Sequence, residues 1–275
     1  MRLKFEKMHG IGNDFVVVGS IEPSSLSPDF IRKLSDRRFG IGCDQVLVAS
    51  APELDGAHIA MKIFNADGTP AKQCGNGIRC FAKFVRGRGI VAADTIRVET
   101  AGGIVEASFL DDGEVSVDMG VPGFEPAAIP MLNGPRATHY ALRLGDEEFT
   151  IGAVSMGNPH VVLVVADAEA APVATLGPKI QAHEWFPDSV NVGFMQVLSP
   201  QHARLRVFER GVGETLACGS GACAAVAVGV IQGVLGNTVR MDLNGGSLKL
   251  EWAGEGSSIR MTGPAAGVFA GEIEI

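Results

Sequence analysis

The sequence predicts an α+β protein of two pseudo-symmetric domains, each a curved, mostly antiparallel, barrel-like sheet wrapped around one buried helix. The first observation is an internal repeat, because landmarks in the first half recur 144 residues (218 − 74) or 145 residues (158 − 13) later. The second is an apolar, helix-like segment after each repeated cysteine, among many short strand-like segments. The repeated landmarks are Asn13 and Asn158, Phe64 and Phe208, and Cys74 and Cys218.

The first half of the chain contains mainly strand-like segments. Residues 15–18 and 45–48 are rich in apolar and β-branched side chains, which is typical of strands, and a further strand should end at Phe64. Ser27 and Pro28 predict the start of a helix that continues through Leu34, with proline at the first helical position. A second helix is predicted at 78–86, followed by strands at 95–99 and 115–118.

The second half repeats this order. Residues 204–207 alternate between polar and apolar side chains, as a half-buried strand does, and residues 257–261 read the same way. A helix is predicted at 222–230, while a weaker helical segment at 171–183 should be broken at Gly177 and Pro178. A Pro- and Gly-rich stretch between 120 and 135 predicts the domain boundary, so the first domain should cover 1–118 and the second should begin at 119.

Composition excludes several classes of protein. The 275-residue chain has a net charge of −8 and a pI near 5.3, so it lacks the basic surface that non-specific nucleic-acid binding requires. The most apolar stretch, 222–231, is too short to span a bilayer, and the N-terminal residues do not resemble a signal peptide. We therefore expect a soluble, cytoplasmic protein with no nucleic-acid or membrane partner. Five cysteines, an odd number, argue against a disulfide framework.

The two repeated cysteines suggest the chemistry. Cys74 and Cys218 each precede a Gly-x-Gly sequence and an apolar helix. The free N–H groups and the dipole at a helix start attract an anion and favour a thiolate. The glycines allow a positive φ or a close approach to a ligand, and Ser220 could cap its helix. A substrate carboxylate held by both helices would place its α-carbon between two sulfurs, with a base on one face and an acid on the other.

Other interpretations of these cysteines are weaker. A single cysteine is often only a small buried side chain, which is how we interpret Cys43, Cys80 and Cys223. A zinc site or a thiol redox site usually contains a C-x-x-C sequence, and none occurs here. We therefore expect no metal site.

Polar residues at repeated positions extend the candidate site. Asn13 matches Asn158, and Asn65 matches Glu209, each directly after the repeated phenylalanine. The adjacent Arg210 could bind a second carboxylate through its planar guanidinium. Asn191 follows a short apolar segment, and His160 lies beside Asn158 in sequence. Each alone could be a turn former or an ordinary core residue.

Several motifs, taken together, resemble those of the diaminopimelate epimerase family, in the expected order and over most of the chain. The glycine-rich motifs are Met8-His9-Gly10-Ile11-Gly12-Asn13-Asp14-Phe15 and Phe64-Asn65-Ala66-Asp67-Gly68. The cysteine and histidine motifs are Gln73-Cys74-Gly75-Asn76-Gly77, Gly157-Asn158-Pro159-His160, and Glu209-Arg210-Gly211 through Ala217-Cys218-Gly219-Ser220-Gly221.

This resemblance implies an epimerase that needs no pyridoxal phosphate or other cofactor and interconverts LL- and meso-2,6-diaminopimelate for lysine and peptidoglycan synthesis. It implies that Cys74 and Cys218 are the acid/base pair and that His160 and Glu209 tune the catalytic groups. Gly75-Asn76 and Gly219-Ser220 would hold the reacting carboxylate. The residues implied to bind substrate are Asn13, Gln45, Asn65, Asn158, Asn191, Glu209 and Arg210.

The resemblance also implies a homodimer, and a last strand, 265–275, that returns to the first domain. The second domain would then cover 119–264, with the active site in the cleft between the domains. Proline racemase and hydroxyproline epimerase resemble the same plan of paired cysteines. In a different class, the chain could be an amino-acid-binding protein without catalytic activity.

Overall fold

The computed structural model describes residues 2–19, 26–72, 74–132 and 134–274. Gln73 of the first cysteine motif and the C-terminal Ile275 therefore lie outside the described residues. The chain divides into two compact units, one formed by Met1–Asp118 with Thr262–Ile275 and the other by Met119–Met261.

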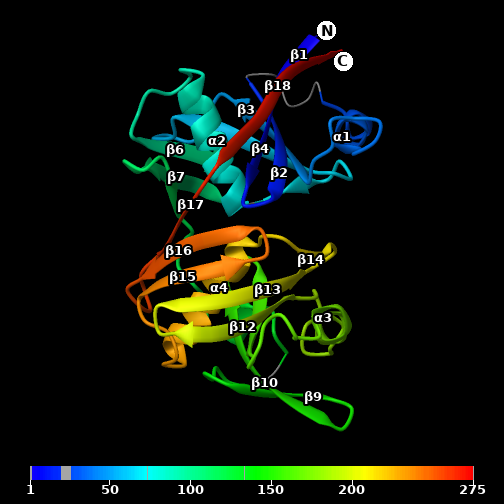
Figure 1. Cartoon of the computed structure of the whole chain (residues 1–275), viewed down its shortest axis with the longest axis vertical. Helices are drawn as coiled ribbons and strands as arrows, with labels where there is room; N and C mark the ends of the chain where they lie inside the picture. Colours follow the sequence, from blue (N-terminus) through cyan, green and yellow to red (C-terminus); the bar gives the residue numbers. More distant parts are fainter. Residues whose placement is uncertain (1, 20–25, 73, 133, 275) are drawn as a thin grey trace. The chain divides into compact units, whose positions relative to one another are not determined.

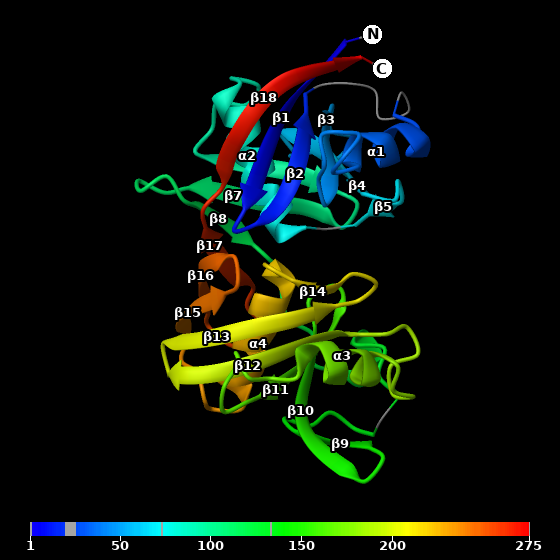
Figure 2. The same ribbon diagram turned by 45° about the vertical axis from the view of Figure 1, so that its right-hand side comes forward.

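The first unit is a sheet with one helix on each face (Figure 1). Its strands are β1 (Arg2–Gly10), β2 (Asn13–Val18), β3 (Gln45–Ser50), β4 (Ile59–Asn65), β5 (Pro70–Ala71), β6 (Thr95–Thr100), β7 (Gly103–Phe109), β8 (Val115–Asp118) and the C-terminal β18 (Ala266–Glu274). Its helices are α1 (Pro28–Ser35) and α2 (Gly75–Gly87). Strand β18 pairs antiparallel with β1, as Figure 2 shows.

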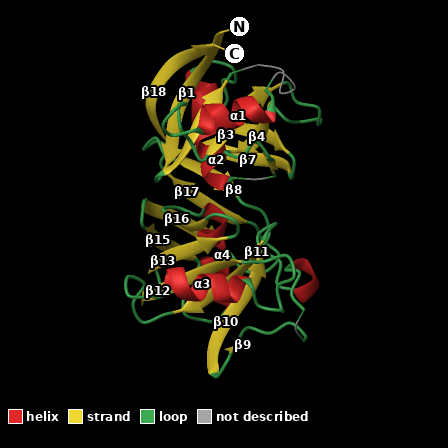
Figure 3. Cartoon of the chain, turned by 90° about the vertical axis from the view of Figure 1, so that its right-hand side faces the viewer, coloured by secondary structure: helices red, strands yellow, loops and turns green. Residues whose placement is uncertain are grey.

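The second unit contains β9 (Tyr140–Leu144), β10 (Glu147–Ser155), β11 (Pro159–Val164), β12 (Asn191–Ser199), β13 (His202–Glu209), β14 (Gly213–Thr215), β15 (Thr238–Leu243) and β16 (Gly246–Trp252). Strand β17 (Ile259–Gly263) spans the point where the chain returns to the first unit. The helices are α3 (Val173–Gln181), α4 (Gly219–Ile231) and the short 3-10 helix η2 (Pro126–Ala128). Figure 3 shows α3 and α4 in red among the strands of this unit.

The pairing pattern confirms the predicted duplication. In the first unit, β1 and β2 are antiparallel, β2 and β3 parallel, β3 and β4 antiparallel, β4 and β6 parallel, and β6 and β7 antiparallel. In the second unit, β10 through β13, β15 and β16 repeat the same series. The predicted fold class, two pseudo-symmetric α+β halves, is therefore confirmed.

Both faces of the central strands are buried, which explains their continuous apolar runs. Val16 and Val18 of β2 pack in one cluster with Ile31 of α1. Because side chains alternate along a strand, Phe15 and Val17 point to the opposite face, where α2 contacts β2. In the second unit, the corresponding cluster includes residues of β11, β12 and α3, and α4 contacts β10, β11 and β12.

Most predicted elements lie close to their observed bounds, with two differences. Ser27 caps α1 as predicted, because its hydroxyl accepts the Phe30 N–H at 3.1 Å. However, α3 continues through Pro178 instead of ending there. Buried Val173 and Ile180 hold this helix against the sheet, and tertiary packing outweighs the lost hydrogen bond. The strand predicted at 257–261 begins at Ile259, because Ser257 belongs to a turn closed by the Gly254 carbonyl.

Candidate active site

Cys74 lies at the start of α2 and caps it with its sulfur. Its backbone is extended (φ −150°, ψ 105°), and the Sγ accepts the Gly77 N–H at 3.3 Å. The first helical residues, Gly75 and Asn76, contribute the N–H groups that a helix start leaves without intrahelical partners. A sulfur at this position is stabilised in its anionic form by the helix dipole.

Cys218 occupies the equivalent position at the start of α4. Its backbone is also extended (φ −117°, ψ 105°), and the Sγ accepts the Gly221 N–H at 3.4 Å. The prediction that Ser220 caps this helix is wrong, because the cysteine is the cap. The Ser220 hydroxyl instead lies 3.7 Å from the Cys218 Sγ.

The third residue after each cysteine is glycine because of close packing. Neither Gly77 nor Gly221 has a positive φ. A Cβ at Gly77 would lie 3.4 Å from the Cys74 sulfur, and one at Gly221 would lie 3.1 Å from the Cys218 sulfur. An added methyl group would therefore press directly on the sulfur that caps the helix.

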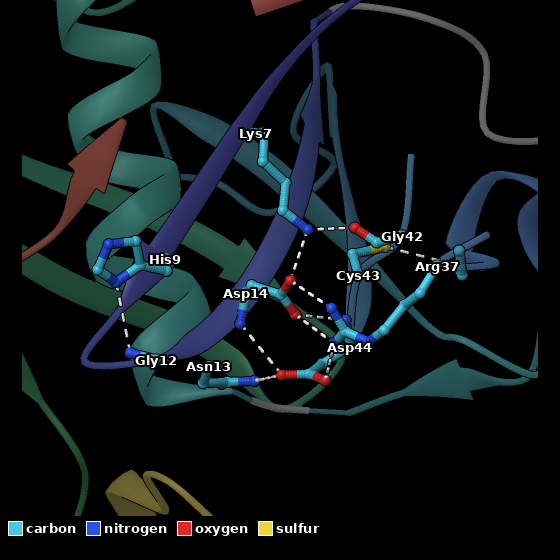
Figure 4. A network of polar contacts seen from close by, with 10 residues as sticks. Lys7, His9, Gly12, Asn13, Asp14, Arg37, Gly42, Cys43 and Asp44 are labelled. Atoms are coloured by element: carbon cyan, nitrogen blue, oxygen red, sulfur yellow. Dashed lines mark hydrogen bonds and ion pairs between the residues drawn. The ribbon is translucent and has the colours of Figure 1, made fainter. Parts of the chain in front are cut away.

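Asn13 and Asn76 lie next to Cys74. The Cys74 Sγ lies 3.7 Å from the Asn13 Oδ1, and the Asn76 Nδ2 donates to the same oxygen at 3.3 Å. The Asn13 Nδ2 donates in turn to Asp44 at 2.8 Å, within the network of polar contacts in Figure 4. Cys74 therefore faces a neutral amide oxygen, which can accept a hydrogen bond but is not a practical base.

Gln45 and Asn65 are brought together by the pairing of β3 with β4. They are direct partners in the antiparallel register, and the Gln45 Nε2 donates to the Asn65 Oδ1 at 2.9 Å. The Asn65 Nδ2 donates to the Thr69 hydroxyl at 3.1 Å. The two predicted substrate-binding amides thus form one polar group in the first unit.

Glu209 contacts Cys218 directly. The thiol donates to the Glu209 Oε2 at 3.1 Å, and the Thr215 hydroxyl donates to the Oε1 of the same carboxylate. Cys218 is only 4% exposed. Burial, then the negative charge of Glu209 and the hydrogen bond to it, raise the pKa of the Cys218 thiol well above its usual value. The prediction that Cys218 has a lowered pKa is therefore wrong, because burial and Glu209 outweigh the effect of the helix start.

Buried His160 and half-buried Asn158 form a polar pair at the start of β11. Burial, and to a smaller extent the positive charge of Arg210, lower the pKa of His160 to about 3. The ring is therefore neutral at pH 7. Its Nε2 lies 2.9 Å from the Asn158 Oδ1, and because that oxygen can only accept, the Nε2–H donates. The interaction fixes the orientation of the Asn158 amide, which leaves its NH₂ group for other partners.

Asn191 and Arg210 are joined across β12 and the end of β13. The Asn191 Oδ1 accepts the Arg210 backbone N–H at 2.9 Å, and the Asn191 Nδ2 donates to the Pro159 carbonyl at 3.0 Å. The Arg210 guanidinium donates to the Asp188 carbonyl at 2.8 Å. Asn191 therefore fixes the backbone at Arg210, beside Glu209.

The predicted site residues thus form two sets, one in each unit. The first set comprises Asn13, Gln45, Asn65, Cys74, Gly75 and Asn76, and the second comprises Asn158, His160, Asn191, Glu209, Arg210, Cys218, Gly219 and Ser220. Sequence reasoning missed Asp44, Arg79 and Thr215, which hold members of these sets. The one available signal was position, because Asp44 directly precedes Gln45 and Thr215 lies three residues before Cys218.

Comparison with known proteins identifies the family. A model of the family described as diaminopimelate epimerase matches residues 5–125 and 152–268. The chain belongs to the diaminopimelate epimerase family. Two curated diaminopimelate epimerases cover the whole of this chain and are covered by it completely: one from Thioalkalivibrio sulfidiphilus is 57% identical, and one from Nitrosomonas europaea is 53% identical.

The diaminopimelate epimerase fold is shared more widely. A solved structure of a probable proline racemase from Agrobacterium radiobacter covers 99% of this chain with a TM-score of 0.69 and 17% identity, and 93% of that structure is covered. At this identity the likeness concerns the fold alone. No disulfide bond joins the five cysteines of this epimerase-family chain, all of which lie in the described ranges. In the described ranges, no group of three or more His, Cys, Asp or Glu side chains could hold a metal ion. Within the same ranges, no helix combines the length and apolar character needed to cross a membrane.

Proposed function

We propose that this protein interconverts LL- and meso-2,6-diaminopimelate by two-base proton transfer between Cys74 and Cys218. The observation that carries the proposal is the repeated geometry at two helix starts. In each unit a cysteine sulfur caps the helix, and an oxygen acceptor lies beside it. The reaction is the isomerase activity for which the curated relatives are named.

The first requirement is to make the α-hydrogen of an amino acid acidic enough to remove. A carboxylate bound by the N–H groups of Gly75-Asn76 and Gly219-Ser220 would lie at two positive helix ends. These groups stabilise negative charge as it develops on the carboxylate during proton removal. Such an arrangement lowers the barrier electrostatically and needs no covalent adduct with a cofactor.

The second requirement is one thiolate and one thiol on opposite faces of the α-carbon. The thiolate removes the α-proton, and the opposite thiol gives its proton to the other face. The stereocentre is inverted, and the two cysteines exchange protonation states. This step requires both domains, 1–118 with 265–275 and 119–264, to contribute their cysteine to one bound substrate.

Glu209 supplies a proton acceptor for Cys218. The carboxylate can take the thiol proton across the 3.1 Å contact and so generate the thiolate that the buried sulfur does not form by itself. His160 remains neutral and orients Asn158, so its proposed role in catalysis is indirect.

The remaining polar residues suit the far end of the substrate. Diaminopimelate carries a second amino-acid group. Its carboxylate needs a positively charged partner, and its ammonium group needs hydrogen-bonding partners. Arg210 offers a guanidinium for the carboxylate, and Asn158 and Asn191 offer amide groups beside it. Gln45 and Asn65 offer a further polar pair in the first unit. Proline and hydroxyproline have no second amino-acid group, which is why we favour diaminopimelate.

The decisive experiment is incubation of the reduced enzyme with LL-diaminopimelate in D₂O, followed by NMR of the α-protons. Deuterium in an α-position together with meso product is the expected result. An absence of exchange would reject the assignment, and proline and hydroxyproline would be tested next under the same conditions. An amino-acid-binding protein without catalysis would bind diaminopimelate but leave the α-protons unchanged.

The same proposal places the enzyme in the cytoplasm as a homodimer. Two reacting cysteines must stay reduced, which the cytoplasm ensures. Val268 and Phe269 of β18 are 57% and 49% exposed, and these apolar side chains provide contact area for a second copy. A sedimentation mass close to twice 28.7 kDa supports the dimer, and a mass of one chain at assay concentration contradicts it.

A further inference from the structure

The amide of Asn13 is part of a continuous chain of hydrogen bonds with a defined direction. The Arg79 Nη2 donates to the Asn76 Oδ1 at 2.9 Å. The Asn76 Nδ2 donates to the Asn13 Oδ1 at 3.3 Å, and the Asn13 Nδ2 donates to the Asp44 Oδ2 at 2.8 Å. Each side-chain amide thus receives one hydrogen bond and donates the next.

The two ends of this chain determine the orientation of both amides. A guanidinium can only donate hydrogen bonds, and an ionised carboxylate can only accept them. Arg79 therefore requires the oxygen of Asn76 to face it, and Asp44 requires the NH₂ group of Asn13 to face it. A flip of the Asn13 amide would place two NH₂ groups against each other at one end and two oxygens against each other at the other.

This orientation decides which atom of Asn13 faces the reacting sulfur. The Asn13 Oδ1 lies 3.7 Å from the Cys74 Sγ, where it accepts from the thiol. The reverse orientation would present an NH₂ group and would favour the thiolate instead. A cysteine that must alternate between thiol and thiolate is sensitive to this difference.

Asp44, which directly precedes β3, is itself held by hydrogen bonds and an ion pair with its neighbours (Figure 4). It accepts from the Arg37 Nη2 at 2.7 Å and from the Asp14 backbone N–H at 3.1 Å, and its own N–H donates to the Asp14 Oδ1 at 2.9 Å. Burial alone would raise the pKa of the Asp14 carboxyl, but contacts from Arg37 and Lys7 outweigh it and hold that pKa well below its usual range.

We propose that Asp44 is a positioning residue, which orients the Asn13 amide so that its oxygen faces the Cys74 thiol during epimerisation. The inference rests on the proposed function of Cys74 as an acid/base residue. Its physical content, the orientation of one amide, can be tested without any substrate.

Other charged or titratable groups surround this chain of hydrogen bonds, so the Asp44 variants must leave these residues unchanged. They lie on the strands and the loop around Asn13 and on the helix that Cys74 caps: Lys7, His9, Asp14, Arg37, Arg79 and Cys80.

The kinetic test compares Asp44→Asn with Arg37→Ala. The introduced asparagine retains the size of the native side chain but has only one oxygen for three donors, so the hold on Asn13 is weakened. We expect kcat to fall about tenfold, with KM changed less than about threefold, the scale of one lost hydrogen bond. Arg37→Ala weakens the same network but leaves the contact between Asn13 and Asp44. If the two variants lose a comparable amount of Tm, Arg37→Ala should lower kcat less than Asp44→Asn does. The exposed Asp111→Asn controls for loss of one negative charge, and Asp44→Glu should recover part of the rate.

The thiol test uses iodoacetamide, with the modified cysteine identified by peptide mass spectrometry over a range of pH. In Asp44→Asn, the midpoint of the Cys74 profile should move to lower pH, because an NH₂ group can now face the sulfur. The Cys218 profile, from the other unit, should not move and serves as an internal control.

The two tests separate this inference from the proposed function. If wild-type protein fails to exchange α-protons, the proposed function fails, while the Cys74 profile still tests the orientation of Asn13. An unchanged Cys74 profile in folded Asp44→Asn would overturn the positioning role. A kcat of Asp44→Asn within about twofold of wild type would overturn the importance of Asp44 in catalysis. An equal loss of kcat in Arg37→Ala at the same Tm would overturn it as well.

Discussion

Replacement of Glu209 by glutamine should have opposite effects on two properties of Cys218. The carboxylate lies 3.1 Å from the sulfur, and its charge opposes the thiolate. Glutamine removes that charge with almost no change in volume, so the raised pKa of Cys218 should fall. Alkylation of Cys218 at a fixed pH near 8 should therefore become faster. Epimerisation should become slower, because no group remains to take the thiol proton.

The size of the kinetic loss follows from the geometry. A positioned acid or base commonly contributes about 10² to 10⁴ to a rate. Cys218 is only 4% exposed, so bulk water has poor access to replace the carboxylate. We expect kcat for Glu209→Gln to fall about 100-fold, at the lower end of that range, because the helix start still stabilises the thiolate.

The assay is deuterium incorporation from D₂O, measured in parallel with iodoacetamide labelling of Cys218. Thr215→Val is a matched second variant, because it removes the hydroxyl that holds the other carboxylate oxygen, and it should cost about tenfold or less. Glu184→Gln and Thr150→Val alter exposed residues and should leave both measurements unchanged. Slower labelling of Cys218 in Glu209→Gln, or a kcat within about threefold of wild type, would refute the reasoning.

The remaining predictions concern the two cysteines, the packing of the core and the dependence of stability on pH. Cys74→Ala and Cys218→Ala should each lower epimerisation more than about 10³-fold, the scale of losing an essential acid or base, and near-wild-type turnover in either would contradict a two-base reaction. Gly152→Ala should destabilise the second unit by about 1–3 kcal/mol in urea unfolding, because the new Cβ would lie 2.3 Å from the Val228 Cγ1. Gly87→Ala, at the end of α2 with nothing within 4 Å, is its control, and an equal loss there would argue against overpacking. The pKa of His160 is lowered to about 3 in the folded chain from about 6.5 when unfolded, so the unfolded chain takes up the proton first as pH falls. The free energy of unfolding should therefore decrease from pH 6.5 towards pH 3, by up to ~1.4 kcal/mol per pH unit, and this dependence should be shallower in His160→Gln.

The repeat made much of the fold predictable. Asn13 and Asn158, and Cys74 and Cys218, recur at nearly one spacing, and each cysteine begins a buried helix in the structure. The continuation of α3 through Pro178 was not predictable, because local backbone preference opposes it. The cause is tertiary: a Cβ at Gly177 would lie 2.7 Å from the Phe208 side chain, so glycine lets this helix pack closely on the sheet.

The state of Cys218 shows why a site is harder to predict than a fold. Its local sequence, a cysteine before Gly-x-Gly and an apolar helix, favours a thiolate as it does for Cys74. Burial and Glu209 reverse that preference, and both depend on the pairing of strands distant from the helix. Asp44 and Thr215 could not be predicted for a similar reason. Asp44 contacts Asn13 and Thr215 contacts Glu209, and only the fold brings these partners together.

The two halves share a scaffold but differ in one residue beside the reacting sulfur. Asn65 and Glu209 occupy matching positions of the repeat, directly after Phe64 and Phe208. Asn65 receives a hydrogen bond from Gln45, whereas Glu209 accepts one from the Cys218 thiol. The shared scaffold places each sulfur at a helix start, and divergence at this one position puts a carboxylate in contact with the Cys218 sulfur, where the first unit has an amide that contacts Gln45. Glu209→Asn would make the two positions alike. If it epimerised as fast as wild type, the difference between the halves would have no part in the proton transfer.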